Sequence, residues 1–448
     1  MIYSSAKLKN NIYKFLLRIN GTNFNREYSK IEYLDNLNDF TNFQKMSVDN
    51  LLNHSCKNVK YYKEIFEGYF NKDMSFKEVP ILTKNIIKEN FKEIISNDLN
   101  KRSWYCNSTG GSTGEPLRFV QDKKYIKWAY ANNYYYYKNI LGIDEPKSKK
   151  IVLWGSEKDL FENKTSLKTN LVTLLNNTIS LNSFKMTDEY MDKYINYINS
   201  YKPDLIRGYA GSLYEICRYA ERKNKKIHTP QFVISAAETL RSEMRKKIEE
   251  IFGTKVYNFY GSREISSIAG ECKEGCMHIL PGNYIEILKG NAEVKVGKEG
   301  KIVITNLFNY AMPFIRYEIG DLAIKGPKKC KCGSVLPTMK KVTGRITDHF
   351  LLENGNVIPA EFFIHLIGVV CNLDAINKFQ VIQEDYNELR ILVVLNSDMK
   401  LAEKKNIENK IKVVMGEKCR ITWETVNEIP KTKTGKFIYT KSLVWNDI

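Results

Sequence analysis

PQFVISAAETLRSEMRKKIEEIFGTKVYNFYGSRE, residues 230–264, is the part of the sequence from which the class of fold follows most directly. The apolar run FVISA predicts a strand. The next segment predicts an amphipathic helix, because its apolar residues recur at three- and four-residue spacing up to Gly253. The run KVYNFYG predicts a second strand. A strand, a helix and a strand in succession form the repeating unit of a parallel sheet covered by helices.

The same alternation continues on the N-terminal side of this unit. KIVLWG predicts a strand, and PDLIRGYAGSLYEICRYAERK predicts a strand, a turn and a helix. Around residues 284–325 the pattern changes, because YIEILK, AEVKV, GKIVITNL and IRYEIGDLAI predict strands without helices between them. We therefore expect an α/β fold with a largely parallel sheet and a strand-rich portion that is antiparallel or barrel-like.

The two ends of the chain have different patterns. Residues 1–100 read mainly as helices, for example LTKNIIKENFKEII, for which Thr83 is the expected N-cap. Residues 344–448 predict a small α+β domain, with strands KFQVIQED, NELRILVVLN and RITWETV and a helix before the last of them. With the boundary in TGRITDHF, the predicted domains are residues 1–343 and 344–448.

Length and composition describe a folded protein of more than one domain. The chain has 448 residues, of which 43% are hydrophobic and 12% aromatic, enough for a large core. The first residues, MIYSSAKLKNNIYKFLLRIN, lack the long apolar run and cleavage site of a signal peptide. No apolar run reaches the roughly 18 residues of a membrane span. We expect a cytoplasmic protein, in which nine cysteines do not indicate a disulfide framework.

The net charge of +18 allows two interpretations. Strongly basic chains are typical of proteins that bind nucleic acid or an anionic membrane surface. Here the lysines are spread along the whole chain, as in KLKNNIYKF and ERKNKKIH, and no basic block is long enough to form a tail. This distribution favours charge that serves solubility, so we expect no nucleic-acid partner.

Residues 107–119, NSTGGSTGEPLRF, are rich in Gly, Ser and Thr. Glycines permit the backbone angles of a loop that wraps phosphate with N–H groups, and the hydroxyls add donors. The phosphate loop of nucleotide kinases and GTPases, G-x-x-x-x-G-K-[ST], needs a Lys where Glu115 follows Gly114. Taken alone, the segment fits a mobile surface loop as well as it fits a phosphate loop.

Five further segments follow in order: AAE at 236–238, YGSRE at 260–264, PFIRYEIGD at 313–321, TGRITD at 343–348 and PKTKTGK at 430–436. In this order they resemble the adenylate-forming enzymes, the superfamily of acyl-coenzyme A synthetases, peptide-synthetase adenylation domains and luciferases. The details STGGSTGEPL, AAE, YIEIL and CKCG are similar to the phenylacetate–coenzyme A ligase-like branch, including the CapK-type proteins. The resemblance covers the chain from roughly residue 100 to its C-terminus.

The resemblance implies a fold and a two-step reaction. The fold is a large N-terminal domain of several α/β subdomains with a small mobile C-terminal domain. In the reaction a carboxylate attacks the α-phosphate of ATP, assisted by Mg²⁺, and gives an acyl-adenylate and pyrophosphate. A thiol, expected to be that of coenzyme A, then displaces AMP. An amine or hydroxyl acceptor, for example in polysaccharide or secondary-metabolite biosynthesis, is the alternative, and a monomer or a homodimer is equally compatible.

The resemblance also assigns nucleotide-binding roles by position. The loop over the β- and γ-phosphates would consist of Ser108, Thr109, Gly110, Gly111, Ser112, Thr113 and Gly114. The adenine side would be formed by Tyr260, Gly261, Ser262, Ala236, Ala237 and Glu238. Asp321 resembles the carboxylate that accepts hydrogen bonds from both ribose hydroxyls, and Arg345 resembles the arginine that reaches ribose or phosphate.

Two further residues resemble the catalytic groups. Glu264 matches the carboxylate associated with Mg²⁺, a hard cation that takes oxygen ligands beside phosphates. Lys436 matches the lysine that the small domain brings to the carboxylate and the α-phosphate. This domain rotates between the half-reactions in the family, and the hinge position here is Thr347, where Asp or Lys is usual, followed by Asp348.

Cysteines cluster in ECKEGCMH, which contains Cys272, Cys276 and His278, and in KKCKCGS, which contains Cys330 and Cys332. Tetrahedral Zn²⁺ takes three thiolates and an imidazole readily, so five candidates exist for four places in a structural site. The family branch carries a cysteine, a histidine six residues later and a C-x-C pair. This resemblance selects Cys272, His278, Cys330 and Cys332, with Cys276 as an alternative ligand, and ordinary reduced surface cysteines are the competing interpretation.

A basic nucleic-acid-binding protein is the competing function from a different class. It accounts for the charge of +18 and predicts lysines gathered on one face and strong salt dependence. It gives no reason for Glu264, Asp321 and Lys436 to stand within their motifs, so the ligase interpretation is preferred.

Overall fold

The structure is a computed structural model of the 448-residue chain. It describes residues 23–37, 39–70, 76–108, 117–154, 177–183, 188–345, 350–353, 357–358, 363, 366–367, 375–429 and 439–444. The chain divides into two compact units. The first consists of Met1–Leu240 and Arg245–Thr343, and the second of Arg241–Met244 and Gly344–Ile448.

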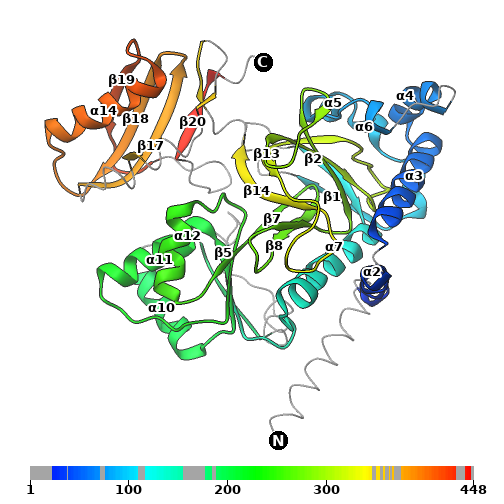
Figure 1. Ribbon diagram of the computed structural model, residues 1–448, viewed down its shortest axis with the longest axis horizontal. Helices are drawn as coiled ribbons and strands as arrows, with labels where there is room; N and C mark the ends of the chain where they lie inside the picture. Colours follow the sequence, from blue (N-terminus) through cyan, green and yellow to red (C-terminus); the bar gives the residue numbers. More distant parts are fainter. Residues whose placement is uncertain are drawn as a thin grey trace, which may run out of the picture. The chain divides into compact units, whose positions relative to one another are not determined.

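The described residues of the first unit form a twelve-stranded sheet in the order β11-β10-β12-β13-β14-β9-β8-β7-β6-β5-β3-β4. Its parallel part consists of β3 (Lys150–Leu153), β4 (Thr178–Leu181), β5 (Leu205–Tyr209), β6 (Phe232–Ala236) and β7 (Val256–Ser262). The connecting helices, which lie together beside β5 (Figure 1), are α10 (Asp188–Tyr201), α11 (Ala210–Arg222) and α12 (Ser242–Phe252). The strand, helix and strand predicted from residues 230–264 are therefore β6, α12 and β7, and the predicted α/β class is confirmed.

The sheet continues beyond β7 with antiparallel strands. These are β8 (Ser266–Glu271), β9 (Met277–Ile279), β10 (Asn283–Lys289), β11 (Ala292–Glu293), β12 (Glu299–Asn306), β13 (Tyr317–Lys325) and β14 (Thr338–Arg345). Of the two forms predicted for this portion, the antiparallel sheet is the right one. The run AEVKV contributes only the two residues of β11, which pair with the end of β10.

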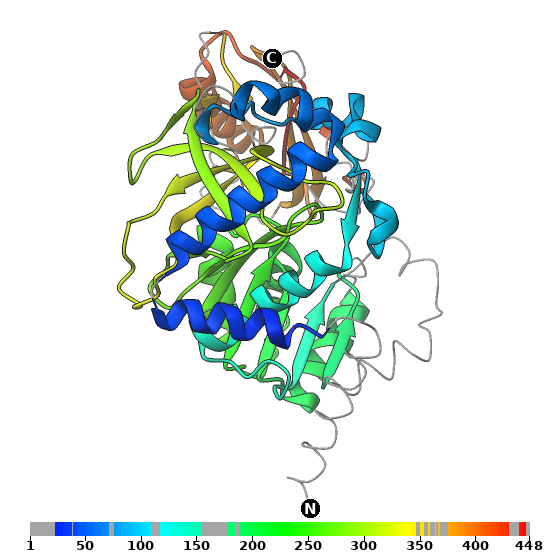
Figure 2. The ribbon, with the colours of Figure 1, turned by 90° about the vertical axis from the view of Figure 1, so that its right-hand side faces the viewer.

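Helices of the N-terminal region pack on this antiparallel part. They include α2 (Asn25–Leu37), α3 (Phe40–Asn58) and α4 (Lys60–Phe70). Figure 2 shows the blue helices α2 and α3 in front of the strands, and Gln44 on α3 donates to the backbone oxygen of Asn283 on β10 at 2.9 Å. The mainly helical entry region expected from the sequence thus covers the sheet edge that carries β10.

The segment LTKNIIKENFKEII forms two short helices rather than one. They are α5 (Lys84–Glu89) and α6 (Phe91–Ile94). Thr83 caps α5 as predicted, because its side-chain oxygen accepts a hydrogen bond from the backbone N–H of Ile86. The helix stops at Asn90, whose side-chain amide donates back to the Ile86 carbonyl at 2.9 Å and so competes with a continuous helix.

A hairpin and a long helix connect the entry region to the parallel strands. The hairpin consists of β1 (Trp104–Ser108) and β2 (Arg118–Asp122), which pair antiparallel. Asp122 caps α7 (Lys123–Tyr135) by accepting from the N–H of Tyr125 at 2.8 Å. The helix continues as a π-helical turn, η3 (Tyr136–Leu141), which ends at Gly142. The segment 109–116, within the glycine-rich run, therefore joins two paired strands.

The second unit has its own sheet and core. Its four-stranded sheet has the order β19-β18-β17-β20, with β17 (Ile376–Asp385), β18 (Glu388–Leu395), β19 (Arg420–Thr425) and β20 (Thr440–Ser442). Helix α14 (Leu401–Met415) buries Ile407 and Ile411 against Phe379 and Ile391 of this sheet. The predicted small α+β domain at the C-terminus is confirmed.

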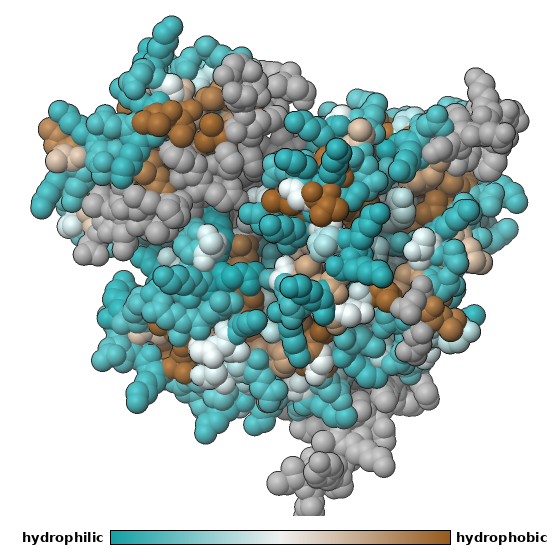
Figure 3. All heavy atoms as spheres, in the orientation of Figure 1, coloured by the Kyte–Doolittle hydropathy of each residue, from teal (hydrophilic) through white to brown (hydrophobic). Residues whose placement is uncertain are grey.

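The surface in Figure 3 is mostly hydrophilic. Among the coloured residues of this face, the apolar ones form small separate groups. None of the described helices combines the length and the apolar character needed to cross a membrane.

Candidate active site

The segment YGSRE forms the end of β7 and the turn into β8. Gly261 is required there because a Cβ atom would lie 2.4 Å from the backbone oxygen of Ser266. The hydroxyl of Tyr260 donates to Oδ2 of Asp321 at 2.6 Å. Asp321 lies on β13 and is only 6% exposed. The structure therefore brings together two predicted nucleotide-binding residues that stand 61 positions apart in the sequence.

Glu264 ends the YGSRE segment, and its carboxyl group is buried, with 7% of the residue exposed. The hydroxyl of Tyr317 donates to its Oε1 at 3.3 Å. Among the described residues no Lys or Arg forms an ion pair with Glu264. A buried carboxylate is costly unless it is hydrogen-bonded and paired, so this site is suited to a divalent cation with oxygen ligands.

The base of the glycine-rich loop lies beside the same segment. Nη1 of Arg263 donates to the backbone oxygen of Ser108, the last residue of β1, at 3.2 Å. The remaining loop residues of the prediction lie outside the described residues: Thr109, Gly110, Gly111, Ser112, Thr113 and Gly114. Ser108 and its contact with Arg263 therefore anchor one end of the predicted phosphate loop next to Glu264.

Gln121 connects the hairpin to YGSRE and was missed from the sequence. Its side-chain Nε2 donates to the carbonyl oxygens of Arg263 and Glu264, at 3.1 Å each. Its Oε1 accepts from the Tyr105 hydroxyl at 2.7 Å and from the Asn107 amide at 3.3 Å. One buried amide thus uses both its ends to hold the loop strands against the segment that carries Glu264. The strand RFVQD carries three polar residues, and no local pattern distinguishes Gln121 among them.

The segment AAE follows β6 and turns sharply. Ala237 has a φ of 67°, a left-handed conformation that costs a non-glycine residue about 1 kcal/mol and is enriched at functional sites. The turn brings Oε2 of Glu238 to the backbone N–H of Gly211, which donates at 2.7 Å. Gly211 is in the first turn of α11, where a carboxylate is favoured by the helix dipole. Ala236 is the last residue of β6, so the whole segment lies at the carboxyl end of the parallel strands.

The remaining predicted site residues lie after Thr343, where the first unit ends, and belong to the second unit. Arg345 is the last residue of β14. Thr347, Asp348 and Lys436 lie outside the described residues. Their roles stay predictions from the resemblance.

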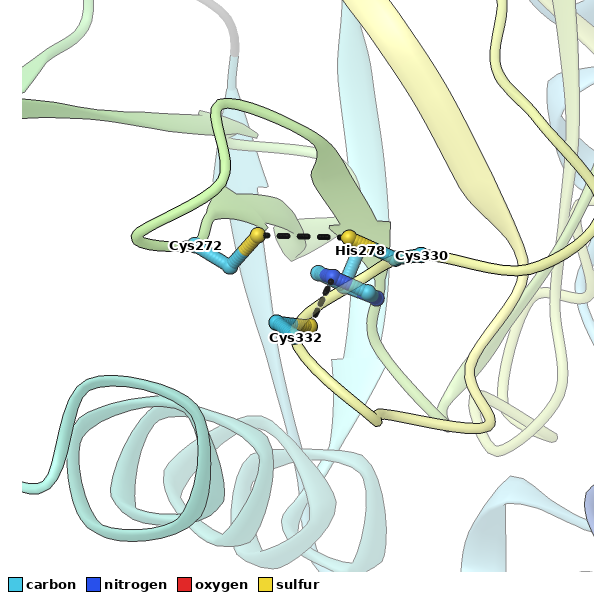
Figure 4. Close-up of side chains that lie close together, drawn as sticks. All are labelled: Cys272, His278, Cys330 and Cys332. Carbon is cyan, nitrogen blue, oxygen red and sulfur yellow. Dashed lines mark hydrogen bonds between the residues drawn. The ribbon is translucent and has the colours of Figure 1, made fainter.

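Four of the five predicted metal ligands lie together. The ligand atoms of Cys272, His278, Cys330 and Cys332 are all within 4.8 Å of one another (Figure 4). The sulfur atoms of Cys272 and Cys330 are 3.6 Å apart, and Sγ of Cys332 is 3.2 Å from Nε2 of His278. Cys276 does not belong to this group of four, although its thiol lies beside that of Cys330.

Two turns of the strand-rich part position these ligands. Cys272 follows β8 and His278 lies in β9, across a tight turn in which Gly275 has a φ of 77°. Cys330 and Cys332 lie in the loop between β13 and β14, and β14 pairs with β9 opposite His278. Antiparallel pairing therefore brings two sequence clusters to one place.

Burial shifts the pKa of three of these groups. It raises the pKa of the Cys272 thiol to about 12 and that of Cys276 to about 11. Burial also lowers the pKa of His278, so its imidazole is neutral at pH 7 and has a lone pair to offer. A metal that binds here would displace thiol protons, as is usual for cysteine ligands.

Named proteins are similar in sequence to this chain. A family model described as the CapK C-terminal domain matches residues 350–443. The chain is 26% identical over 438 residues to Protein CapK of Staphylococcus aureus. This match covers 91% of the chain and 90% of CapK. It is also 26% identical over 271 residues to phenylacetate-coenzyme A ligase of Thermus thermophilus. This second match covers 53% of the chain and 60% of that enzyme.

Solved structures with the same fold include 2-hydroxyisobutyryl-CoA ligase in the postadenylation state. The match has a TM-score of 0.65 at 17% identity and covers 89% of each chain. At this level of identity it shows the fold, and the fold predicted from the motif order is confirmed. The two relatives and the family model confirm the resemblance to the phenylacetate–coenzyme A ligase and CapK-type branch.

Proposed function

We propose that this chain, a member of the phenylacetate–coenzyme A ligase and CapK-type branch of the adenylate-forming enzymes, is an AMP-forming carboxylate ligase. It activates a carboxylic acid with ATP to an acyl-adenylate and releases pyrophosphate. An acceptor then takes the acyl group and displaces AMP.

The observation that carries this proposal is that the YGSRE segment contacts β13 twice, through Tyr260 with Asp321 and through Glu264 with Tyr317. Two buried carboxylates, Asp321 on β13 and Glu264 in the turn between β7 and β8, each accept a hydrogen bond from a tyrosine hydroxyl. Asp321 is suited to the ribose hydroxyls and Tyr260 to the adenine ring, while Glu264 is suited to Mg²⁺. Gln121 and Arg263 hold the phosphate-loop strands next to these groups. Binding ATP in one orientation requires this combination, because the reaction depends on alignment and on charge stabilisation.

Coenzyme A is the acceptor we prefer. The matched relative from Thermus thermophilus and the structural neighbour are both named as coenzyme A ligases. An amine or hydroxyl acceptor is the second candidate, because the relative that covers 91% of this chain is CapK rather than a named coenzyme A ligase.

A pyrophosphate-release assay tests the proposal. We expect release only when ATP, Mg²⁺ and a suitable acid from a broad panel of carboxylates are all present. Hydroxylamine traps the acyl-adenylate as a hydroxamate and so reports the first step, and faster release of AMP on adding coenzyme A to the active mixture tests the preferred acceptor. If no acid promotes pyrophosphate release, or if ADP and phosphate form instead, the proposal is wrong.

We further propose that Cys272, His278, Cys330 and Cys332 bind a structural Zn²⁺. Zn–S bonds of about 2.3 Å and Zn–N bonds of about 2.0 Å place tetrahedral ligand atoms about 3.5 to 3.8 Å apart. The observed separations of 3.6 and 3.2 Å are close to these values. Four protein ligands leave no open position, so the ion would join the β8–β9 turn to the β13–β14 loop and take no part in the reaction.

Replacing both Cys330 and Cys332 by Ser tests the zinc proposal. We expect purified protein to hold one zinc per chain and the double variant to hold none. The free energy of unfolding would fall by on the order of 5 kcal/mol, because metal binding contributes to folding. Metal analysis and thermal unfolding measure both effects, with Cys56→Ser as the control at an isolated cysteine. Unchanged zinc in the double variant contradicts the site, and loss of zinc in Cys276→Ser would make Cys276 a ligand.

A further inference from the structure

The guanidinium of Arg207 lies among aromatic rings at the end of the parallel strands. Its carbon is 4.9 Å from the centre of the Phe259 ring and 5.5 Å from that of Trp154. Its Nη1 donates to the hydroxyl of Tyr137 at 3.2 Å. The Trp154 ring also meets Tyr209 edge-on, at 4.6 Å between centroids. Arginine is suited to such a place, because its planar group stacks on rings while its edges stay free for hydrogen bonds.

The guanidinium of Arg207 lacks a hydrogen-bond acceptor for one of its N–H groups and lacks an ion-pair partner among the described residues. Its Nε is buried and donates no hydrogen bond, and no Asp or Glu of the described residues forms an ion pair with Arg207. A buried donor without an acceptor costs free energy, as does a charge without a counter-charge. Since Arg207 is partly exposed and Trp154 is 40% exposed, a ligand from solvent can reach the group.

The strand register relates Arg207 to the proposed nucleotide site. Tyr209, Ala236 and Phe259 are paired neighbours across β5, β6 and β7, so their side chains share one face of the sheet. Arg207 lies two residues before Tyr209 and is therefore on that face too. Tyr260 directly follows Phe259, and its hydroxyl donates to Asp321. Arg207 is the central residue of β5, and its guanidinium reaches Trp154, which directly follows β3. The guanidinium thus extends toward the carboxyl ends of the parallel strands, where ligands of α/β folds bind.

We propose that Arg207 binds a second carboxylate of the acid substrate. This inference rests on the proposed function and makes its substrate a dicarboxylic acid: one carboxylate is activated by ATP, and the other pairs with the guanidinium. A carboxylate would accept from the accessible edge of the guanidinium and provide the missing counter-charge. The rings of Phe259 and Trp154 exclude water around this pair and so strengthen it. No bond is made or broken at Arg207, which acts as a specificity-determining residue.

Binding without turnover is the decisive measurement. We would titrate the full chain by calorimetry with two matched pairs of acids, isophthalate against benzoate and adipate against hexanoate. The wild-type protein is expected to bind at least one diacid roughly 10- to 100-fold more tightly than its monoacid, the range expected for a charged hydrogen-bonded pair. Arg207→Gln removes this difference without weakening the monoacid. Arg207→Lys keeps part of it, because Lys retains the charge but not the planar fork.

Arg218→Gln is the matched control. Arg218 lies on α11, 42% of its side chain is exposed, and it pairs with Glu215, so its loss should leave all four acids unaffected. If the wild-type protein binds no diacid more tightly than its monoacid, or if Arg207→Gln weakens diacids and monoacids equally, the inference is overturned. Because this test needs no ATP, it remains decisive if pyrophosphate release fails, a result that would count against the ligase activity instead.

Discussion

Lys436→Ala is expected to lower acyl-adenylate formation by on the order of 10²- to 10³-fold, the loss typical of removing one group that stabilises developing charge. Lys436 matches the lysine that meets the carboxylate and the α-phosphate during adenylation. The glycine-rich loop supplies no lysine of its own, since Glu115 follows Gly114. The cation for this step would therefore come from the second unit, and its loss cannot be replaced from the loop.

Four measurements define this prediction. Pyrophosphate exchange should fall in Lys436→Ala, while the melting temperature and ATP affinity stay close to those of the wild type. Transfer of the acyl group from synthetic acyl-adenylate should persist, because the lysine serves the first half-reaction. Lys441→Ala, at an exposed position of β20, is the control and should be fully active. Wild-type pyrophosphate exchange in Lys436→Ala would refute the assignment.

Glu264→Gln should separate activity from stability. The amide keeps the size of the side chain and can still accept from Tyr317, but it removes the negative charge offered to Mg²⁺. We expect kcat to fall by roughly 10²-fold or more and the Mg²⁺ concentration for half-maximal rate to rise. Without ATP and metal, the melting temperature should stay the same or increase, because a buried charge without a cation is costly.

A second buried carboxylate provides the contrast. Glu286 forms an ion pair with Arg316 at 2.9 Å, and both side chains are buried. Glu286→Gln should destabilise the protein by about 3 kcal/mol, because it leaves the arginine without its partner. The Mg²⁺ requirement of the remaining folded enzyme should not change. A Glu264→Gln variant with normal rate and normal Mg²⁺ dependence would show that Glu264 is not a metal-binding group.

Local features of the fold were predictable where one segment carries its own signal. The apolar spacing of residues 242–252 specified α12, and the hydroxyl of Thr83 specified the start of α5. The break at Asn90 was not predicted, because the apolar spacing of LTKNIIKENFKEII continues through it. There the backbone of Asn90 leaves the helical conformation, and its side chain bonds to the carbonyl of Ile86.

The candidate site was predictable as a set of segments, but not as a set of contacts. Asp321 and Glu264 were selected because their motifs stand in the order of a known superfamily. Their partners Tyr260 and Tyr317 follow from the pairing of distant strands, which no local pattern encodes. Glu238 is a similar case, since its segment was expected on the adenine side while its carboxylate binds the start of α11.

The sequence alone was sufficient for the α/β class, the small C-terminal α+β domain, the superfamily and the two clusters of possible zinc ligands. These depend on periodicity, turn residues and motif order, all of which lie along the chain. Tertiary structure decided which four ligands meet and that Gln121 joins the loop strands to YGSRE. It also decided that Arg207 lies among rings and, within the described part of the chain, forms no ion pair with a carboxylate. The physical reason is that hydrogen bonds and burial depend on distances in space, which the sheet sets by pairing strands far apart in sequence.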